Sequence, residues 1–383
     1  MRTNSPIFSR SAALRPGPAL LCLGLWGACA EEAAPPADEK ESFASEAVVG
    51  KADWSLDPCT SRGWYGDGEC DWFCLSPDPD CDEPQLFAKP SGRVAKYPIV
   101  LHHGFAGGHD WIFAWSGVAE ALTADGHTVV VTEVPPFDSV AVRTEYLKAA
   151  VDDILSRTGA AKVNVIAHSI GGLDSRHLIT ALGYGDRVAS LTTISSPHLG
   201  TSAADLGLKV VPGLVDPAVD ALAELLGMKI SDVAESANVR AALTDLSEAN
   251  AARFNAEHPN DSRVVYQSWA GVSSLLGLAK YGRDKTLLAA CNNRLLLNPG
   301  TFDRVRPEFI PLAPVIASGR TGPWHDGLVT VLSSKWGDFK GCIPADHSEE
   351  VGQFTKGPPN PSTGFDSASF YRTVVYDLSA RGM

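Results

Sequence analysis

Residues 163–172 read Val-Asn-Val-Ile-Ala-His-Ser-Ile-Gly-Gly, and this stretch decides the fold. It begins as an apolar strand, turns sharply with Ser169 at the apex, and continues as a helix. Such a turn strains the backbone at its apex and brings the strand close to the helix, so small residues are needed two positions before and after the serine. Ala167 and Gly171 occupy those positions. The pattern therefore predicts a strand–turn–helix unit that presents the Ser169 hydroxyl as a nucleophile.

Strands and helices alternate on both sides of this unit. Apolar runs typical of buried strands occur at 98–102, 128–132, 163–167 and 188–194, and helices are expected over 111–124, around Leu147 to Leu155 with an end near Gly159, and from the turn to Leu182. This alternation predicts a mostly parallel sheet with helices on both faces, whose active site lies at the carboxyl ends of the strands. Together with the serine turn it indicates the α/β-hydrolase fold for residues 90–383.

Charge and composition narrow the function. The 383-residue chain has 44% hydrophobic and 20% charged residues, which is ordinary for a globular enzyme. Its net charge of −13 argues against nucleic acid as a partner.

The first residues are typical of an export signal peptide, expected over 1–29. Three arginines precede an apolar run at 19–28 that is too short to span a bilayer. Residues 25–29 resemble a bacterial lipobox, which would lipidate Cys29 and attach the protein to a membrane, whereas Ala28-Cys29-Ala30 also suits ordinary cleavage. We therefore expect an exported protein, either secreted or an outer-membrane or cell-surface lipoprotein. Residues 30–53, rich in Ala, Glu and Pro, are expected to be a disordered linker.

Eight cysteines suit an exported chain. Beyond Cys22 and Cys29 they form a distant pair, Cys291 and Cys342, and a cluster at Cys59, Cys70, Cys74 and Cys81. The cluster predicts a small disulfide-rich module at 54–84 with two bridges, whose connectivity stays open among three choices. Its segment 66–71 resembles the calcium-binding loop of Lin-12/Notch-type repeats. A passive cap, a calcium-stiffened spacer and a carbohydrate- or surface-binding module remain alternatives.

Ser169 requires a base, and the base requires an orienting acid. In this fold the nucleophile is followed along the chain by Asp or Glu and then by His. Of the downstream histidines (His177, His198, His258, His325 and His347), His347 is expected to be the base because it falls in a late loop before a terminal helix. Asp326 is the expected acid, placed between a strand at 314–317 and another from Leu328, with Asp338 and Asp346 as rivals.

Two backbone N–H groups are needed to hold the negative charge that develops on the substrate oxygen. Ile170, the residue after the nucleophile, is expected to supply one. The loop His102-His103-Gly104-Phe105, after the first core strand, is expected to supply the other through Phe105.

These residues together resemble the bacterial true lipases of the Pseudomonas and Burkholderia type. The resemblance runs from about Tyr97 to Gln353, and it implies Ser169, Asp326 and His347 as the catalytic triad of a triacylglycerol lipase. It rests on Tyr-Pro-Ile-Val-Leu at 97–101, His-Gly-Phe-Ala-Gly at 103–107, Ser-Pro-His-Leu-Gly at 196–200, Tyr-Gln-Ser-Trp-Ala-Gly at 266–271, Asp-Gly-Leu-Val at 326–329 and Asp-His-Ser-Glu-Glu-Val-Gly-Gln at 346–353.

The resemblance implies three further features. One is a structural Ca²⁺ held by Asp303, Glu349 (Asp in the family) and the carbonyls of Gln353 and Gly357, with no organic cofactor. The second is a disulfide, here expected between Cys291 and Cys342, although the family's second cysteine would fall near Leu332. The third is a lid at about 203–239 whose apolar helix begins at Pro217. Some relatives also need a lipase-specific folding chaperone.

The sequence thus predicts an extracellular serine carboxylester hydrolase, a triacylglycerol lipase acting on lipid or ester substrates at an interface. Three alternatives remain open: a short-chain esterase or polyester depolymerase, a phospholipase or acyltransferase, and a non-catalytic surface-binding protein that works through residues 54–84.

Overall fold

The computed structural model describes most of the chain from residue 94 onward. The described residues are 48–49, 65–66, 79–80, 94–105, 115, 117–209, 217–225, 236–275, 277, 281–297, 301–353 and 360–383. The chain divides into two units, 1–43 and 44–383, of which the first lies wholly outside these residues. The predicted signal peptide, nearly all of the linker and the 54–84 module, and residues 210–216 and 226–235 of the lid lie outside the described residues as well. Among the described helices, none is both long and apolar enough to cross a membrane.

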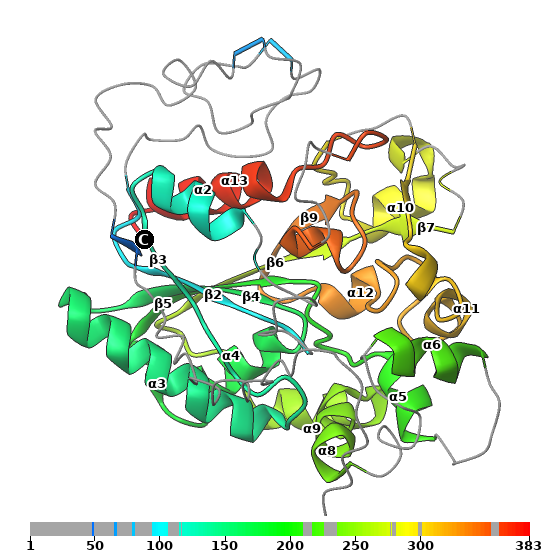
Figure 1. Ribbon diagram of the computed structural model, residues 1–383, viewed down its shortest axis with the longest axis horizontal. Coiled ribbons are helices and arrows are strands. Elements are labelled where there is room, and N and C mark those ends of the chain that lie inside the picture. Colours follow the sequence, from blue (N-terminus) through cyan, green and yellow to red (C-terminus); the bar gives the residue numbers. More distant parts are fainter. Residues whose placement is uncertain are drawn as a thin grey trace, which may run out of the picture. The chain divides into compact units, whose positions relative to one another are not determined.

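A seven-stranded sheet forms the centre of the second unit (Figure 1). The strand order is β1-β3-β2-β4-β5-β6-β9, and all neighbours run parallel except β1, which pairs antiparallel with β3. The strands are β1 Val48–Val49, β2 Ile99–His102, β3 Thr128–Val131, β4 Val163–His168, β5 Val188–Ile194, β6 Val265–Gly271 and β9 Asp338–Ile343. β1 lies in the stretch expected to be a disordered linker, and the sequence did not predict its pairing.

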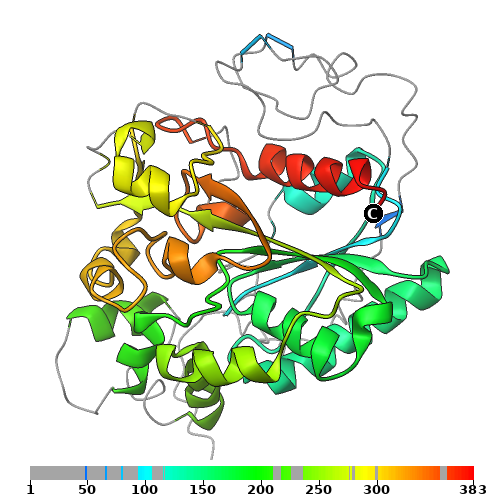
Figure 2. The ribbon, with the colours of Figure 1, turned by 180° about the vertical axis from the view of Figure 1, so that it is seen from behind.

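Helices cover both faces of the sheet, as predicted. On one face, Ile99 and Leu101 of β2 pack with residues of α2 (Val118–Ala124) and α13 (Ser367–Ala380). On the other, Val100 of the same strand packs with α3 (Val140–Thr158) and α4 (Gly171–Thr180). Figures 1 and 2 show the two pairs of helices on opposite sides of the strands. Because both faces are covered, β2, β4 and β5 are buried at every position and do not alternate between buried and exposed residues.

The long helix α3 ends where the sequence predicts, whereas its start at Val140 was not predicted. Ser139 caps its first turn by accepting a hydrogen bond from the Val142 N–H at 3.4 Å. Its last turn is closed by Gly159, whose φ of 66° suits a residue without a side chain.

A further group of helices follows β5 along the chain. It comprises α5 Ser202–Leu208, α6 Pro217–Leu225, α8 Ala237–Leu246 and α9 Glu248–Glu257. The predicted start of α6 at Pro217 is confirmed. The remaining elements are α10 Lys285–Ala290, α11 Ala313–Ala317, α12 Val331–Ser334, the 3-10 helices η1 Tyr184–Asp186, η2 Tyr281–Arg283, η3 Pro307–Phe309 and η4 Glu349–Val351, and the strand pair β7 Ser273–Ser274 and β8 Asp303–Arg304.

The two strands expected around Asp326 were wrong. Residues 314–317 belong to helix α11, which has Pro314 in its first turn. Proline suits a helix start, and a short apolar run does not by itself distinguish a strand from a buried helix. After Leu328 the chain makes a single bridge between His325 and Thr330 and then enters α12. The strand that completes the sheet here is β9, which the sequence did not predict.

Candidate active site

Ser169 lies at the turn between β4 and α4, and its backbone carries the strain that the sequence predicted. Its φ is 55°, in the left-handed region that side-chain-bearing residues rarely adopt. The turn is held by a hydrogen bond of 3.0 Å from the Ser169 N–H to the carbonyl of Ile194, at the end of β5. The side chain is almost buried, with 7% exposed.

The loop after β2 passes directly against this turn. A Cβ atom on Gly104 would lie 2.7 Å from Cβ of Ser169, and one on Gly171 would lie 2.8 Å from the carbonyl oxygen of His103. Both glycines are therefore required by close approach of two backbones. The expected oxyanion residues, Phe105 and Ile170, follow Gly104 and Ser169 directly in the chain.

His347 and Asp326 form a buried pair. Nδ1 of His347 lies 2.8 Å from Oδ2 of Asp326, and the His347 N–H donates to the Asp326 carbonyl at 2.9 Å. The other oxygen, Oδ1, accepts from the N–H groups of Leu328 (2.8 Å) and Val329 (2.7 Å). Burial alone would raise the pKa of Asp326, but the charge and hydrogen bond of His347 and the two amides outweigh it and lower the pKa to about 2. Asp326 is thus ionised across the physiological range.

The His347 ring lies against the residue that precedes Ser169. Its centroid is 4.4 Å from that of His168, the last residue of β4. Asp326 lies in the loop before α12, and His347 lies in the loop after β9. The structure therefore brings both residues beside the end of β4, although they are far from it in the sequence.

The rival residues lie elsewhere. Asp338 is at the exposed start of β9, where it pairs with Arg294 and Lys340. Asp346 accepts hydrogen bonds from backbone N–H groups of residues 306, 348 and 349. Among the other histidines, His177 and His258 contact each other at 2.8 Å, and His198 contacts Thr193 and Arg176.

The expected calcium ligands Asp303 and Glu349 come together in a buried acidic cluster with Asp346. Burial and the neighbouring charge of Glu349 raise the pKa of Asp303 to about 9 and that of Asp346 to about 7, and burial raises the pKa of Glu349. Oδ2 of Asp303 makes no hydrogen bond to the described residues. Asn360, which no sequence signal identified, donates through Nδ2 to Asp303 at 3.1 Å and to Glu349 at 3.0 Å. Gln353 is described, whereas Gly357 lies outside the described residues.

A second buried group was also missed by sequence reasoning. Glu350 accepts a hydrogen bond from Ser195 Oγ at 2.6 Å and contacts His168 Nε2 at 3.2 Å. One ligand atom each of Glu350, His168 and His347 lies within 4.8 Å of the others, a spacing that could hold a metal ion. Burial, and then the charge of Asp326, raises the pKa of Glu350, while burial lowers that of His168.

An apolar cluster lies beside the two expected oxyanion residues. Ile170 is completely buried in it with residues of α4, α5 and α8, and Phe105 packs against it. Helix α6, in the expected lid, contributes Ala218, Val219, Ala221, Leu222 and Ala223 to the same cluster.

Comparison with known proteins identifies the family. Residues 97–278 match a family model described as the alpha/beta hydrolase fold. A triacylglycerol lipase of Pseudarthrobacter phenanthrenivorans is 35% identical over 328 residues, covering 76% of this chain and 98% of the relative. One of Burkholderia plantarii is 34% identical over 338 residues, covering 78% and 90%. The chain belongs to the triacylglycerol lipase family.

Solved structures of this fold agree. A metagenomic carboxyl esterase superposes with a TM-score of 0.54 at 16% identity, covering 87% of this chain and 97% of the esterase. The lipase of Staphylococcus hyicus superposes with a TM-score of 0.50 at 16% identity, covering 79% and 99%. The predicted fold class, the lipase family and the enzyme class, a carboxylic ester hydrolase, are confirmed. The predicted Cys291–Cys342 disulfide is present as well, with the two Cα atoms 5.6 Å apart.

Proposed function

We propose that this lipase is exported and hydrolyses triacylglycerols at lipid interfaces through Ser169, His347 and Asp326. The observation that carries the proposal is the buried His347–Asp326 pair, at 2.8 Å, packed against the neighbour of Ser169. His347 takes the proton of Ser169, whose oxygen attacks the ester carbonyl. The N–H groups of Phe105 and Ile170 hold the negative charge that develops on the carbonyl oxygen. The alcohol then leaves with a proton from His347, and water releases the fatty acid from the acyl-enzyme.

Asp326 orients and stabilises the imidazolium of His347 in this scheme. A carboxylate can do this only while it is ionised, and the lowered pKa of Asp326 keeps it so. Its second oxygen is held by two backbone amides, so the carboxylate cannot turn away from the imidazole.

We assign the role of lid to helix α6. Its apolar residues share a cluster with Ile170 and Phe105, so its displacement would open apolar surface beside the nucleophile. A lipid surface would replace the contacts that the helix loses. The rate should therefore rise sharply when an ester substrate exceeds its solubility limit, and smooth saturation through that limit would argue for an esterase without a lid.

A calcium ion is the second part of the proposal. Asp303 and Glu349, with the carbonyls of Gln353 and Gly357, would hold it, and it would neutralise acids that flank the base in sequence. Two features favour this fit: the donors are hard oxygen ligands, and a buried Asp303 oxygen has no hydrogen bond to the described residues. We propose export on the basis of residues 1–29, with secretion and lipidation at Cys29 as alternatives.

The decisive test compares wild type with Ser169→Ala. Purified protein is labelled with a fluorophosphonate and assayed on p-nitrophenyl esters of increasing chain length. Loss of both labelling and turnover in a variant of unchanged thermal stability is expected. Turnover retained by Ser169→Ala would reject the mechanism, and a preference confined to short chains would favour the esterase alternative.

A further inference from the structure

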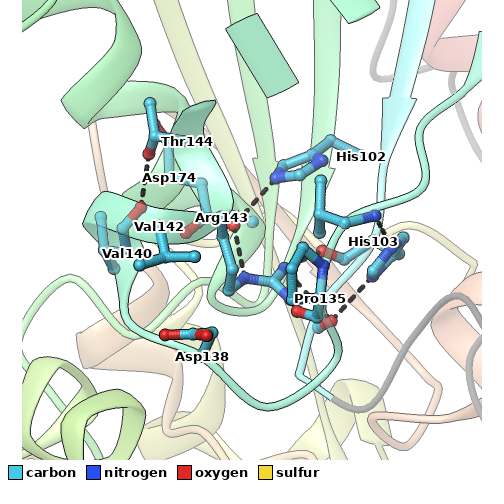
Figure 3. Close-up of polar contacts among 12 residues, drawn as sticks. His102, His103, Pro135, Asp138, Val140, Val142, Arg143, Thr144 and Asp174 are labelled. Carbon is cyan, nitrogen blue, oxygen red and sulfur yellow. Dashed lines mark hydrogen bonds and ion pairs between the residues drawn. The ribbon is translucent and has the colours of Figure 1, made fainter. Parts of the chain in front are cut away.

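A buried polar network lies beneath the loop that carries Phe105 (Figure 3). Its centre is the guanidinium of Arg143, which is completely buried on α3. Nε of Arg143 donates to Oδ2 of Asp174 at 2.9 Å, and Asp174 also accepts from Nε2 of His102 at 2.9 Å. The sequence carried a signal for this network, because Arg143 lies four residues before Leu147, on the buried and mostly apolar face of α3.

Both Nη groups of Arg143 reach backbone carbonyls of nearby loops. Nη1 donates to Pro135 at 2.8 Å, and Nη2 donates to His103 at 2.8 Å and to Gly104 at 3.4 Å. A planar fork of fixed N–H directions can hold several acceptors in one geometry, which a single ammonium cannot do.

His103 adds a second donor to the Gly104 carbonyl. Nε2 of His103 lies 3.2 Å from the backbone N–H of Val134, which can only donate, so Nε2 must be the acceptor. The proton of the neutral ring is then on Nδ1, which lies 2.9 Å from the Gly104 carbonyl oxygen. This tautomer makes Nδ1–H a donor to that carbonyl.

The orientation of the Gly104 carbonyl determines that of the Phe105 N–H. Both belong to one planar peptide unit, in which C=O and N–H point in opposite directions. Two donors that hold the carbonyl on the Arg143 side therefore hold the N–H on the other side. Gly104 itself lies against Ser169, so a flip of this peptide would replace a donor at the nucleophile by an acceptor.

We infer that Arg143 and His103 are positioning residues for the oxyanion hole, which fix the peptide between Gly104 and Phe105 with its N–H toward the substrate oxygen. The inference rests on the proposed function. Arg143 is in turn held by Asp174, whose N–H donates to the carbonyl of Ile170 at 3.0 Å in the first turn of α4. One ion pair thus connects the loop of the first oxyanion donor to the helix of the second.

The test is Arg143→Lys, assayed on a soluble oxoester and on its thionoester. Lysine keeps the positive charge beside Asp174 but loses the fork that holds the loop carbonyls. We expect kcat on the oxoester to fall about 100-fold, the loss that follows removal of one oxyanion donor, while KM changes less than threefold. Thiocarbonyl sulfur accepts hydrogen bonds poorly, so the thionoester should lose much less, and the oxo-to-thiono rate ratio should fall at least tenfold.

The matched control is Arg372→Lys, in the buried Arg372–Asp125 pair between α13 and α2. It should lower thermal stability and leave the rate ratio within twofold. If Arg143→Lys does not fold, the double variant Arg143→Met with Asp174→Leu removes both charges and should show the same fall in ratio. His103→Asn, whose amide lies near the position of Nδ1, should keep a higher ratio than His103→Gln.

The outcomes distinguish failure of the positioning role from failure of the proposed function. If Ser169→Ala abolishes turnover but a folded Arg143 variant keeps the wild-type kcat and rate ratio, only the positioning role is overturned. If Ser169→Ala retains turnover, the proposed function fails and the positioning role fails with it.

Discussion

Removal of the Cys291–Cys342 disulfide should destabilise the domain by an amount that its position determines. Both cysteines are completely buried, so alanine is a better replacement than serine, which would bury a hydroxyl. The bridge joins the end of α10 to β9, the edge strand that leads into His347, and it closes a loop of 51 residues.

The chain-entropy model converts this loop length into about 4 kcal/mol of stability at 25 °C. For a domain of this size, a loss of 1 kcal/mol lowers the melting temperature by about 2 °C, so the Cys291→Ala and Cys342→Ala double variant should melt about 8 °C below wild type. The measurement is thermal unfolding by circular dichroism, with residual ester hydrolysis after brief heating as a second readout. The temperature of half-inactivation should fall by a similar amount, because β9 holds the loop of the base.

Reduction of the wild-type protein is the control. With dithiothreitol and mild denaturant, wild type should approach the melting temperature of the double variant. Any further fall in the melting temperature of the variant measures the contribution of disulfides formed by the remaining cysteines. A double variant that melts within about 1 °C of wild type would refute the loop-closure reasoning. A normal melting temperature with lost activity would instead assign the bridge to local positioning of His347.

Three further predictions follow from the charges of buried groups. Asp326→Asn should lower kcat about 10⁴-fold without unfolding the protein, because asparagine cannot hold the required tautomer of His347. As a control in the same assay, the kcat of Asp338→Asn should stay within twofold of the wild-type value. Chelation of calcium should lower the melting temperature more at pH 8 than at pH 5. Asp303, with its pKa raised to about 9, holds a proton that the ion must displace, so the ion binds more weakly and stabilises the fold less as the pH falls. Asp303→Asn should abolish the difference. Burial, followed by the charge of Arg372, lowers the pKa of His127 from 6.5 to about 4. The unfolded chain therefore binds a proton that the fold excludes, and stability falls as the pH drops from 6.5 to 4, by about 3 kcal/mol for this residue. The free energy of unfolding, measured by urea unfolding at pH 6.5 and at pH 4, should therefore fall less between these two pH values in His127→Asn than in wild type.

Local patterns predicted the parts of the fold that local forces determine. The serine turn was readable because its small residues are required by the approach of β4 to α4. The helix α3 and its end were readable because the apolar stripe and Gly159 are local signals, whereas its start was not predicted. The edge strand β9 was not readable. Its sequence, Asp-Phe-Lys-Gly-Cys-Ile, has little strand preference, and it is a strand because it pairs with β6.

The candidate site was predicted in the same uneven way. Chain order and the family resemblance singled out Asp326 although both of its expected flanking strands were wrong. Asn360 had no signal, because its contact with Asp303 spans 57 positions and depends on the whole fold. Arg143 did have a sequence signal, because a charged residue on the apolar stripe of a helix must find buried partners, but no role was predicted for it.

The buried carboxyl groups near His347 differ in charge for one physical reason. Asp326 and Asp346 are both completely buried, yet the pKa of the first is lowered to about 2 and that of the second is raised to about 7. Burial raises the pKa of both, and backbone amides favour the ionised form of both. Asp326 also faces the imidazole of His347, which lowers its pKa, whereas the charge of Glu349 raises that of Asp346 further. Because Asp346 immediately precedes His347 in the chain, repulsion within the acidic cluster acts on the backbone that carries the base. A cation bound by Asp303 and Glu349 would therefore steady His347 without touching it, which would separate the structural role of such an ion from the role proposed for Asp326.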